Sequence, residues 1–272
     1  MNALVVGGGG REHTLAWKLK QSPLLDTVYC APGNPGMDGI ECISITDYEE
    51  LAAFAKSHDV GLTIVGPEAP LVDGLVDIFR SHGLKVFGPD KQAAQLEGSK
   101  SFAKDFMERH GIPTAKAASF TNEADALAYL EANPAPIVIK ADGLAAGKGV
   151  TVAQNQEEAI NAVQECFAGA FGDAGAEVLI EECLVGEEAS ILAFVDHHTI
   201  KPLASSQDHK AALEGDTGPN TGGMGAYSPA PVMDDELWQV IDAQVLQPFL
   251  KGCQDDGLDF RGIIYAGIMQ TA

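Results

Sequence analysis

The chain has 272 residues, 46% of them hydrophobic, and a formal net charge of −22. This length suffices for two domains with buried cores, and no apolar run approaches the roughly 20 residues of a membrane-spanning helix. The negative charge argues against general affinity for nucleic acid, which needs a basic surface. The five scattered cysteines favour a reducing cytoplasm without a cysteine metal site, and the N-terminus shows no secretory signal.

The chain opens with a predicted strand, Ala3–Val6, a turn of four glycines and a helix, Arg11–Gln21. An NAD-binding fingerprint would need a glycine where Glu12 stands and an acidic residue at the end of the next strand, Val28–Pro32. We therefore reject NAD binding. The glycine amides at the start of the helix still suit a phosphate group, and Arg11 would add positive charge there.

Strands and helices continue to alternate up to residue 87. We expect helices over Tyr48–His58 and Val72–His82 and strands over Leu62–Val65 and Lys85–Phe87, which predicts a parallel sheet covered on both faces. Ligands bind such sheets at the carboxyl ends of the strands, where the turns at 7–10, 32–36 and 66–70 fall. Glu68, in the last of these turns, is placed either to meet a ligand hydroxyl or to favour a helix dipole.

A predicted helix, Lys91–His110, leads to a second domain with a glycine-rich hairpin. The strands Ile137–Lys140 and Val150–Ala153 flank a turn over 143–149 with three glycines, and neither the spacing nor the following strand fits a nucleotide P-loop. Small residues nevertheless let backbone amides approach phosphate, with Lys140 on the strand and Lys148 at the tip as positive charges. An ordinary hairpin with solvated lysines is the alternative.

The rest of the chain offers two further candidate binding segments. An extended linker after the predicted strand Glu177–Glu181 has backbone groups beside acidic residues that suit an adenine edge and a ribose, although such turns are usually only solvated. The loop Ser205–Ser228 is longer than compact domains usually tolerate without a use. It offers polar side chains at 208–210 and glycine amides at 222–225 to a small ligand. The other elements expected here are helices over 124–131, 156–168 and 236–251, and strands over 189–195, 199–203 and 262–269.

Seven motifs now stand in order along the whole chain: GGGREH at 8–13, APGNPG at 31–36, TIVGPEAPL at 63–71, LEGSK at 96–100, IKADGLAAGKG at 139–149, SQDHK at 206–210 and DTGPNTGGMGAYSP at 216–229. Together they resemble those of the glycinamide ribonucleotide synthetase family of the ATP-grasp superfamily. The resemblance implies an α/β protein with a Rossmann-like domain over 1–102, a parallel sheet with helices on both faces, and an incomplete ATP-grasp domain over 103–272. In the latter, 123–190 would form a lid subdomain and 191–272 the start of the central subdomain.

The resemblance also implies a cytoplasmic ligase that joins glycine to 5-phosphoribosylamine through a glycyl phosphate, with ATP and Mg²⁺ or Mn²⁺, in the second step of purine synthesis. Such chemistry asks the protein mainly for positioning and charge neutralisation, and the catalytic residues would be Lys140, Lys148 and Asp208. The residues implied to bind ATP are Lys104, Lys140, Gly143, Gly147, Lys148, Gly149, Glu181, Glu182, Leu184 and Glu188. Those implied to bind phosphoribosylamine or glycine are Gly9, Gly10, Glu12, Asn34, Glu68, Asp208, His209, Lys210, Thr221, Gly222, Gly223 and Met224.

One departure from the family pattern concerns the C-terminal side. In the family a Glu and an Asn that bind the metal follow the strand corresponding to Gly262–Met269, and a further domain follows them. The sequence given ends at Ala272, before these residues, so we expect the metal ligands to lie beyond Ala272 and none within this chain. We also expect a truncated form inactive as a ligase by itself, and no sheet neighbour for Gly262–Met269. Two alternatives stay open: another ATP-grasp carboxylate–amine ligase, and a module that binds purine nucleotides without turnover.

Overall fold

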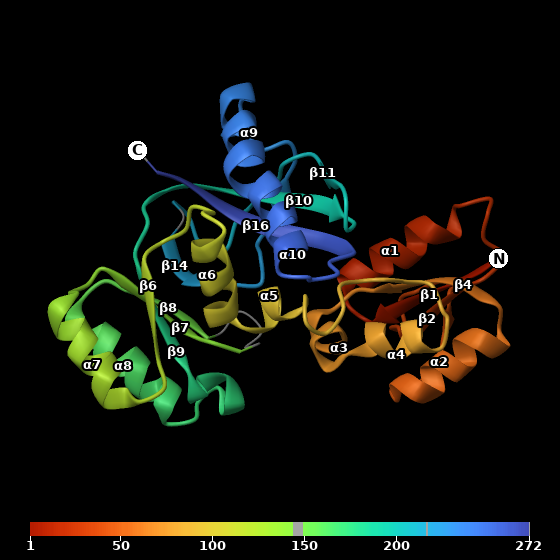
Figure 1. Cartoon of the computed structure of the whole chain (residues 1–272), viewed down its shortest axis with the longest axis horizontal. Helices are drawn as coiled ribbons and strands as arrows, with labels where there is room; N and C mark the ends of the chain where they lie inside the picture. Colours follow the sequence, from red (N-terminus) through yellow and green to blue (C-terminus); the bar gives the residue numbers. More distant parts are fainter. Residues whose placement is uncertain (144–148, 216, 272) are drawn as a thin grey trace. The chain divides into compact units, whose positions relative to one another are not determined.

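The computed structural model describes residues 1–143, 149–215 and 217–271, and it divides into two compact units. The N-terminal unit consists of Met1–Gln95 and Gly257–Gly262, and the C-terminal unit of Leu96–Asp256 and the residues from Ile263 onward. Each unit has its own sheets and core (Figure 1). The boundary expected at residue 102 and the lid subdomain stay predictions.

The N-terminal unit is a five-stranded, all-parallel sheet in the order β3-β2-β1-β4-β5, which confirms the predicted parallel sheet. Its strands are β1 (Asn2–Gly7), β2 (Val28–Pro32), β3 (Glu41–Cys42), β4 (Val60–Val65) and β5 (Val86–Phe87). Its helices are α1 (Gly10–Lys20), α2 (Tyr48–Ser57), α3 (Glu68–Asp73) and α4 (Leu75–Ser81).

Alternation along β1 shows why this sheet carries helices on both faces. Leu4 and Val6 belong to the core beneath α2 and α4, whereas Val5 belongs to the core beneath α1. The single helix expected over Val72–His82 is wrong. Gly74, with φ of 99°, divides α3 from α4, because that backbone conformation ends a helix and favours glycine.

The C-terminal unit begins within α5 (Gln95–Gly98), at Leu96, and continues with α6 (Lys100–Arg109). They are two helices where the sequence predicts one, because Ser99 is extended and its hydroxyl accepts a hydrogen bond from the amide of Phe102, which starts α6 anew. The first sheet of the unit has the order β6-β9-β7-β8, all antiparallel. Its elements are β6 (Ala117–Phe120), α7 (Glu123–Ala132), β7 (Ile137–Ala141), β8 (Val150–Ala153), α8 (Gln156–Phe167), the 3₁₀ helix η1 (Gly172–Ala176) and β9 (Val178–Glu182).

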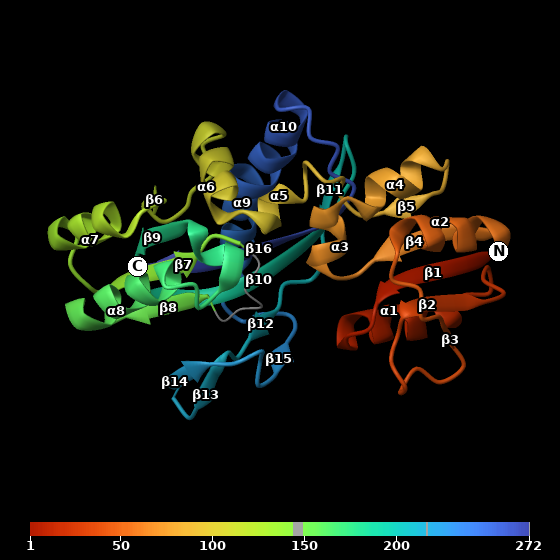
Figure 2. The ribbon, with the colours of Figure 1, turned by 90° about the horizontal axis from the view of Figure 1, so that it is seen from below.

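This sheet confirms the predicted hairpin and carries helices on both of its faces. α7 and α8 pack together against one face (Figures 1 and 2), and Ile137, Ile139 and Ile180 lie in the core between these helices and the sheet. Side chains alternate along a strand, so Lys140 and Glu181 lie on the opposite face, where α6 contacts the strands.

A second sheet in the same unit has the order β11-β10-β16, formed by β10 (Gly186–Val195), β11 (Ile200–Pro202) and β16 (Gly262–Thr271). The expectation that Gly262–Met269 lacks a neighbour is wrong, because β16 pairs with β10. Ala272, beyond which the metal ligands are expected, lies outside the described residues.

The segment expected as a long loop, Ser205–Ser228, is more ordered than predicted. It forms two short antiparallel ladders, β12 (Gln207–Asp208) with β15 (Ala226–Tyr227) and β13 (Ala211–Leu213) with β14 (Thr217–Asn220). The second pair projects from the unit (Figure 2).

The helix expected over Glu236–Lys251 is three continuous segments: α9 (Asp235–Ile241), the π helix η2 (Asp242–Leu246) and α10 (Gln247–Asp255). α10 packs on α6, where Phe106 and Phe249 make an edge contact. None of the helices in the described part of the chain is long and apolar enough to cross a membrane.

Candidate functional site

Two lysines of the C-terminal unit converge on one buried carboxylate. Glu181 of β9 has a side chain only 7% exposed; its Oε2 lies 2.5 Å from Nζ of Lys140 on β7, and its Oε1 lies 3.0 Å from Nζ of Lys104 on α6. Val138 pairs with Glu181 across the sheet, so Lys140 is two residues further along the same face. The group carries two positive charges and one negative charge, and the excess positive charge suits an anionic ligand.

The two lysines differ in how much of their hydrogen-bonding capacity is free. Nζ of Lys104 also donates to Oγ1 of Thr114 at 2.7 Å and to the carbonyl of Ala115 at 2.8 Å, so its three protons are all used. Its side chain is 11% exposed, against 27% for Lys140. Lys140 is therefore the better placed of the two to contact a ligand phosphate, while Lys104 holds Glu181 and the start of the segment leading to β6.

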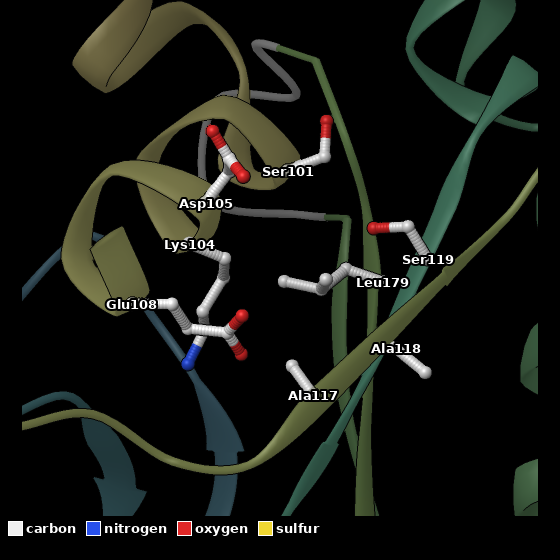
Figure 3. A pocket seen from close by; sticks show the side chains of 8 residues that line it. All are labelled: Ser101, Lys104, Asp105, Glu108, Ala117, Ala118, Ser119 and Leu179. Atoms are coloured by element: carbon white, nitrogen blue, oxygen red, sulfur yellow. The ribbon is translucent and has the colours of Figure 1, made fainter.

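A small pocket lies beside this cluster (Figure 3). Its walls come from α6 on one side and from β6 and β9 on the other; they are Ser101, Lys104, Asp105, Glu108, Ala117, Ala118, Ser119 and Leu179. α6 thus faces β6 and β9 across the pocket, and β9 also carries Glu181.

The end of β9 is the segment expected to hold adenine. Glu182 contacts the backbone of Lys116 twice: its amide donates to the carbonyl at 3.0 Å, and its carboxylate accepts from the amide at 2.9 Å. Leu184, which follows, is 37% exposed. The side chain of Glu181 faces the lysines, so only its backbone remains a candidate for the adenine edge. This assignment stays a prediction.

The glycines of the hairpin turn are described only in part. Gly149 accepts a hydrogen bond from the amide of Ala141 at 2.8 Å. Gly143 packs so closely on η1 that a Cβ there would lie 2.9 Å from Cβ of Ala174, which explains a glycine at this position. Gly147 and Lys148 lie outside the described residues.

A second polar cluster joins three strands of the C-terminal unit. Lys210 donates to Oε1 of Glu188 at 2.5 Å and lies 3.7 Å from Oδ2 of Asp208. Burial lowers the pKa of Lys210, but the hydrogen bond to Glu188 and the nearby Tyr265 and Asp208 outweigh it, so the net pKa is raised and the amine stays protonated. Ser190 hydrogen-bonds Oδ1 of Asp208 at 3.4 Å and the hydroxyl of Tyr265 at 3.2 Å.

This cluster brings together residues that were expected to bind different ligands, Glu188 with the nucleotide and Asp208 and Lys210 with the amine. His209 continues the pairing beside it, since its amide donates to the carbonyl of Gly225 and its carbonyl accepts from Met224. Thr221 is anchored to the carbonyl of Lys210 by both its amide and its hydroxyl. The residues at 221–224 are exposed on this turn, but the amide of Gly223 already donates to Oγ1 of Thr221 at 3.0 Å.

In the N-terminal unit, the glycine turn is organised by Glu12, a buried carboxylate. Its Oε2 accepts from the amide of Gly9 at 2.7 Å and its Oε1 from Nε of Arg11 at 2.9 Å. Arg11 also donates to Oε1 of Glu68 at 2.9 Å. Burial raises the pKa of Glu68, but the hydrogen bond from Arg11, a bond from the backbone amide of Glu68 and the positive charge of Arg11 together outweigh burial, so the net pKa is lowered and the acid is ionised.

This geometry changes the interpretation of the turn. The amide of Gly9, which a phosphate would use, already donates a hydrogen bond to the carboxylate of Glu12. The charge of Arg11 is already neutralised by Glu12 and Glu68. The pair of acids therefore suits an amine or hydroxyl donor. Of the four glycines in this turn, Gly10 alone has open space where a Cβ would stand. Asn34 lies at the same edge of the sheet, where it donates to the carbonyl of Gly8 at 3.0 Å.

The described residues contain no group of three or more His, Cys, Asp or Glu arranged to hold a metal ion. We therefore assign no metal ligand to them, and the expectation that the ligands lie beyond Ala272 stays a prediction.

Comparison with known proteins follows the same division of the chain. A family model described as the N domain of phosphoribosylglycinamide synthetase matches residues 1–97, and one described as its ATP-grasp (A) domain matches residues 98–272. The chain belongs to the phosphoribosylglycinamide synthetase family. This confirms the resemblance and the fold class drawn from the seven motifs.

Individual relatives agree with the family match. The phosphoribosylamine–glycine ligase of Yersinia pestis is 57% identical over the whole chain, which covers 65% of that relative. The crystal structure of the Thermotoga maritima ligase matches with a TM-score of 0.85 and 32% identity over 99% of this chain and 65% of its own. The N5-carboxyaminoimidazole synthase of Aspergillus clavatus, solved with ADP and 5-aminoimidazole ribonucleotide, matches with a TM-score of 0.70 over 99% of this chain and 66% of its own. Because its sequence identity is 16%, this match shows the fold alone. The chain thus spans about 65% of the length of the curated relatives it matches.

Sequence reasoning missed several members of these clusters. Ser190 and Tyr265 lie 75 residues apart and meet only because β10 pairs with β16. Thr114 stands out in the sequence only as part of a helix stop. The available signal was the alternation along β10, which puts Glu188 and Ser190 on one face two residues apart.

Proposed function

We propose that the protein acts as a phosphoribosylamine–glycine ligase, which uses ATP to join glycine to 5-phosphoribosylamine and gives glycinamide ribonucleotide, ADP and phosphate. The observation that carries the proposal is the 57% identity, along the entire chain, to a curated ligase of that name. The two charged clusters of the C-terminal unit support it, because they provide what an ATP-dependent ligation needs: lysines for phosphate and acids for an amine.

In the proposed reaction, a carboxylate oxygen of glycine attacks the γ-phosphorus of ATP, the bond to the bridging oxygen breaks, and ADP leaves. The amine nitrogen of phosphoribosylamine then attacks the acyl carbon of the glycyl phosphate, loses a proton, and expels phosphate. Lys140 neutralises charge on the transferred phosphoryl group, which is the main contribution a protein can make to such a step. A divalent cation supplies further neutralisation when bound, and we assign it no residues in the described part of the chain.

The acids position the amine in this scheme. Asp208, held between Ser190 and Lys210, accepts a hydrogen bond from the attacking nitrogen or from a sugar hydroxyl. Glu188 takes the nucleotide ribose. Glu12 and Glu68 of the N-terminal unit, with Asn34, bind the hydroxyl or amine groups of phosphoribosylamine. The turn at Thr221–Gly223 also contacts phosphoribosylamine, and the neighbouring glycine-rich loop holds glycine. The proposal places the reaction in the cytoplasm, with Mg²⁺ or Mn²⁺ as the divalent cation.

The test is an assay of phosphate release from ATP, catalysed by the polypeptide that the complete encoding frame produces. Release that requires both glycine and phosphoribosylamine would support the proposal. Release with 5-aminoimidazole ribonucleotide and bicarbonate in their place would favour another carboxylate–amine ligase of the same fold. ATP binding without release under any amine would favour a nucleotide-binding module. The Yersinia pestis relative serves as the positive control for the assay.

A further inference from the structure

Lys100 is a half-buried lysine of the C-terminal unit that the proposed reaction does not use. It is the first residue of α6, four residues before Lys104, so the two side chains leave the same face of the helix. A lysine beside a glycine-rich turn would ordinarily be taken as a phosphate ligand. Its contacts give it a different role.

The ammonium group of Lys100 is fully occupied by the backbone. Nζ donates to the carbonyls of Ala141, Asp142 and Gly143 at 2.8, 3.1 and 2.9 Å, three successive residues at the point where β7 ends. An ammonium has three protons, so none is left for a ligand. Burial and the neighbouring Lys140 lower the pKa of Lys100, although Asp142, Glu97 and Glu181 oppose this. The three carbonyls replace the hydrogen bonds to water that the ammonium group loses on burial.

Further bonds hold the same three residues from other directions. Asp142 accepts from the amide of Ser101 at 2.6 Å through its carboxylate, and its own amide donates to the carbonyl of Glu177 at 3.0 Å. Gly143 is packed against Ala174 of η1. The end of β7 is therefore held between α6 and η1, and the side chain of Lys100 supplies three of the bonds from the α6 side.

The bonds from Lys100 attach the end of β7 directly beside Lys140. Lys140 immediately precedes the three carbonyls, and its partner Glu181 is shared with Lys104 on the helix that bears Lys100. We infer that Lys100 is a positioning residue, which fixes the end of β7 on α6 so that Lys140 stays aligned with Glu181 and Lys104 for nucleotide phosphate. The inference rests on the proposed nucleotide site, and it assigns Lys100 no contact with ATP.

Three variants of the chain test this by calorimetric titration with ATP. Lys100→Met should weaken ATP binding by about tenfold. Lys100→Arg should weaken it to a similar degree, because a planar guanidinium keeps the charge but cannot donate to three carbonyls that converge on one point. Lys201→Met, an exposed lysine of the same unit, is the control and should bind ATP as the wild type does.

Amide hydrogen exchange without ATP separates positioning from general destabilisation. In Lys100→Met the amides of Ala141, Asp142 and Gly143 should exchange faster, while those of the core residues Leu130 and Val163 keep their protection. Equal loss of protection throughout the unit would reduce Lys100 to a fold-stabilising residue and overturn the inference. Wild-type affinity in Lys100→Arg would also overturn it, since charge alone would then suffice. A wild-type chain that binds no ATP would instead refute the proposed nucleotide site.

Discussion

At the scale of single residues, the charges that suit ligands are already paired with one another. Lys104 uses every proton on protein acceptors, whereas Lys140 is paired with Glu181 and has a more exposed side chain. The motifs imply phosphate binding for both lysines, but the contacts distinguish them. Lys104 holds Glu181 in place, and Lys140 is the better placed to contact a ligand phosphate.

We expect Lys140→Met to weaken ATP binding by about tenfold to hundredfold, the range of a charge-assisted hydrogen bond, and to lower the melting temperature less than Lys104→Met does, because Glu181 keeps its bond from Lys104. Lys104→Met should lower the melting temperature as well, because it leaves Thr114 and Ala115 without their shared donor. Calorimetry and thermal unfolding measure the two effects. If both variants lost ATP affinity and stability alike, the distinction between the two lysines would be wrong.

The hydroxyl of Tyr265 belongs to the chain of contacts that orients Asp208 through Ser190. Tyr265→Phe should raise the apparent KM for phosphoribosylamine roughly threefold to tenfold, as expected for one lost hydrogen bond, with the KM for ATP unchanged. Steady-state assays of the ligase reaction, on the polypeptide that the complete encoding frame produces, measure both constants, and Tyr129→Phe in the same unit is the control. A change in the KM for ATP alone would show that this cluster serves the nucleotide.

The sequence could predict the residues whose neighbours are local. Lys140 lies in a β-branched run beside glycines, so its strand and its turn follow from the pattern. It could not predict that Ser190 meets Tyr265, or that Lys100 meets the end of β7, because those contacts depend on which strands and helices pair across 41 to 75 residues. The occupation of the Gly9 amide by Glu12 was also missed, although a glutamate three residues after a helix start is typical of such capping.

At the scale of elements, errors in the predicted helices have local causes. In the first two helices that the sequence joined, one residue divides the pair: Gly74 with a positive φ, and Ser99 with an extended backbone that caps α6. Hydrophobic periodicity continues across such breaks and hides them. The long loop was misjudged for the opposite reason, since its ladders are two to four residues long and too short for a strand pattern.

The C-terminal ends of α6 and α10 are joined by one acid. Asp256 accepts two bonds from Arg109, at 3.0 and 2.8 Å, and lies 3.1 Å from Nε2 of His110. Burial raises the pKa of Asp256, but the bonds from Arg109 and His110 outweigh it and hold the net pKa below the ordinary 3.8. Its contribution to stability is therefore present above pH 3.8 and is lost as the pH falls through the lower folded-state pKa.

Asp256→Asn should accordingly lower the melting temperature at neutral pH, and the difference from wild type should shrink to zero well below pH 3.8, where both side chains are neutral. Thermal unfolding over a pH series measures this. Asp255→Asn is the matched control, because that acid is exposed and pairs with Lys251 one helical turn away. A difference that persisted unchanged in strong acid would mean that shape, not charge, joins the two helices.

At the scale of the whole molecule, the net charge of −22 sets what kinds of anion the protein can bind. A small nucleotide needs only a local excess of positive charge, which the cluster of Lys104, Lys140 and Glu181 provides. A polyanion contacts a wide surface and gains its affinity by releasing counterions from many phosphates. The 39 acids outnumber the 17 lysines and arginines, so such a surface would mostly meet like charge.

The chain should therefore not bind duplex DNA or RNA even at low salt, although we propose that it binds ATP. Fluorescence anisotropy of a labelled duplex in about 50 mM salt should stay flat through the micromolar range, where non-specific binders with dissociation constants of about 10⁻⁴ to 10⁻⁶ M begin to respond. A lysine-rich polypeptide titrated into the same duplex confirms that the probe reports binding. Saturable binding that weakens steeply with salt would reveal a basic surface that the overall charge conceals, and would reopen nucleic acid as a partner of this protein.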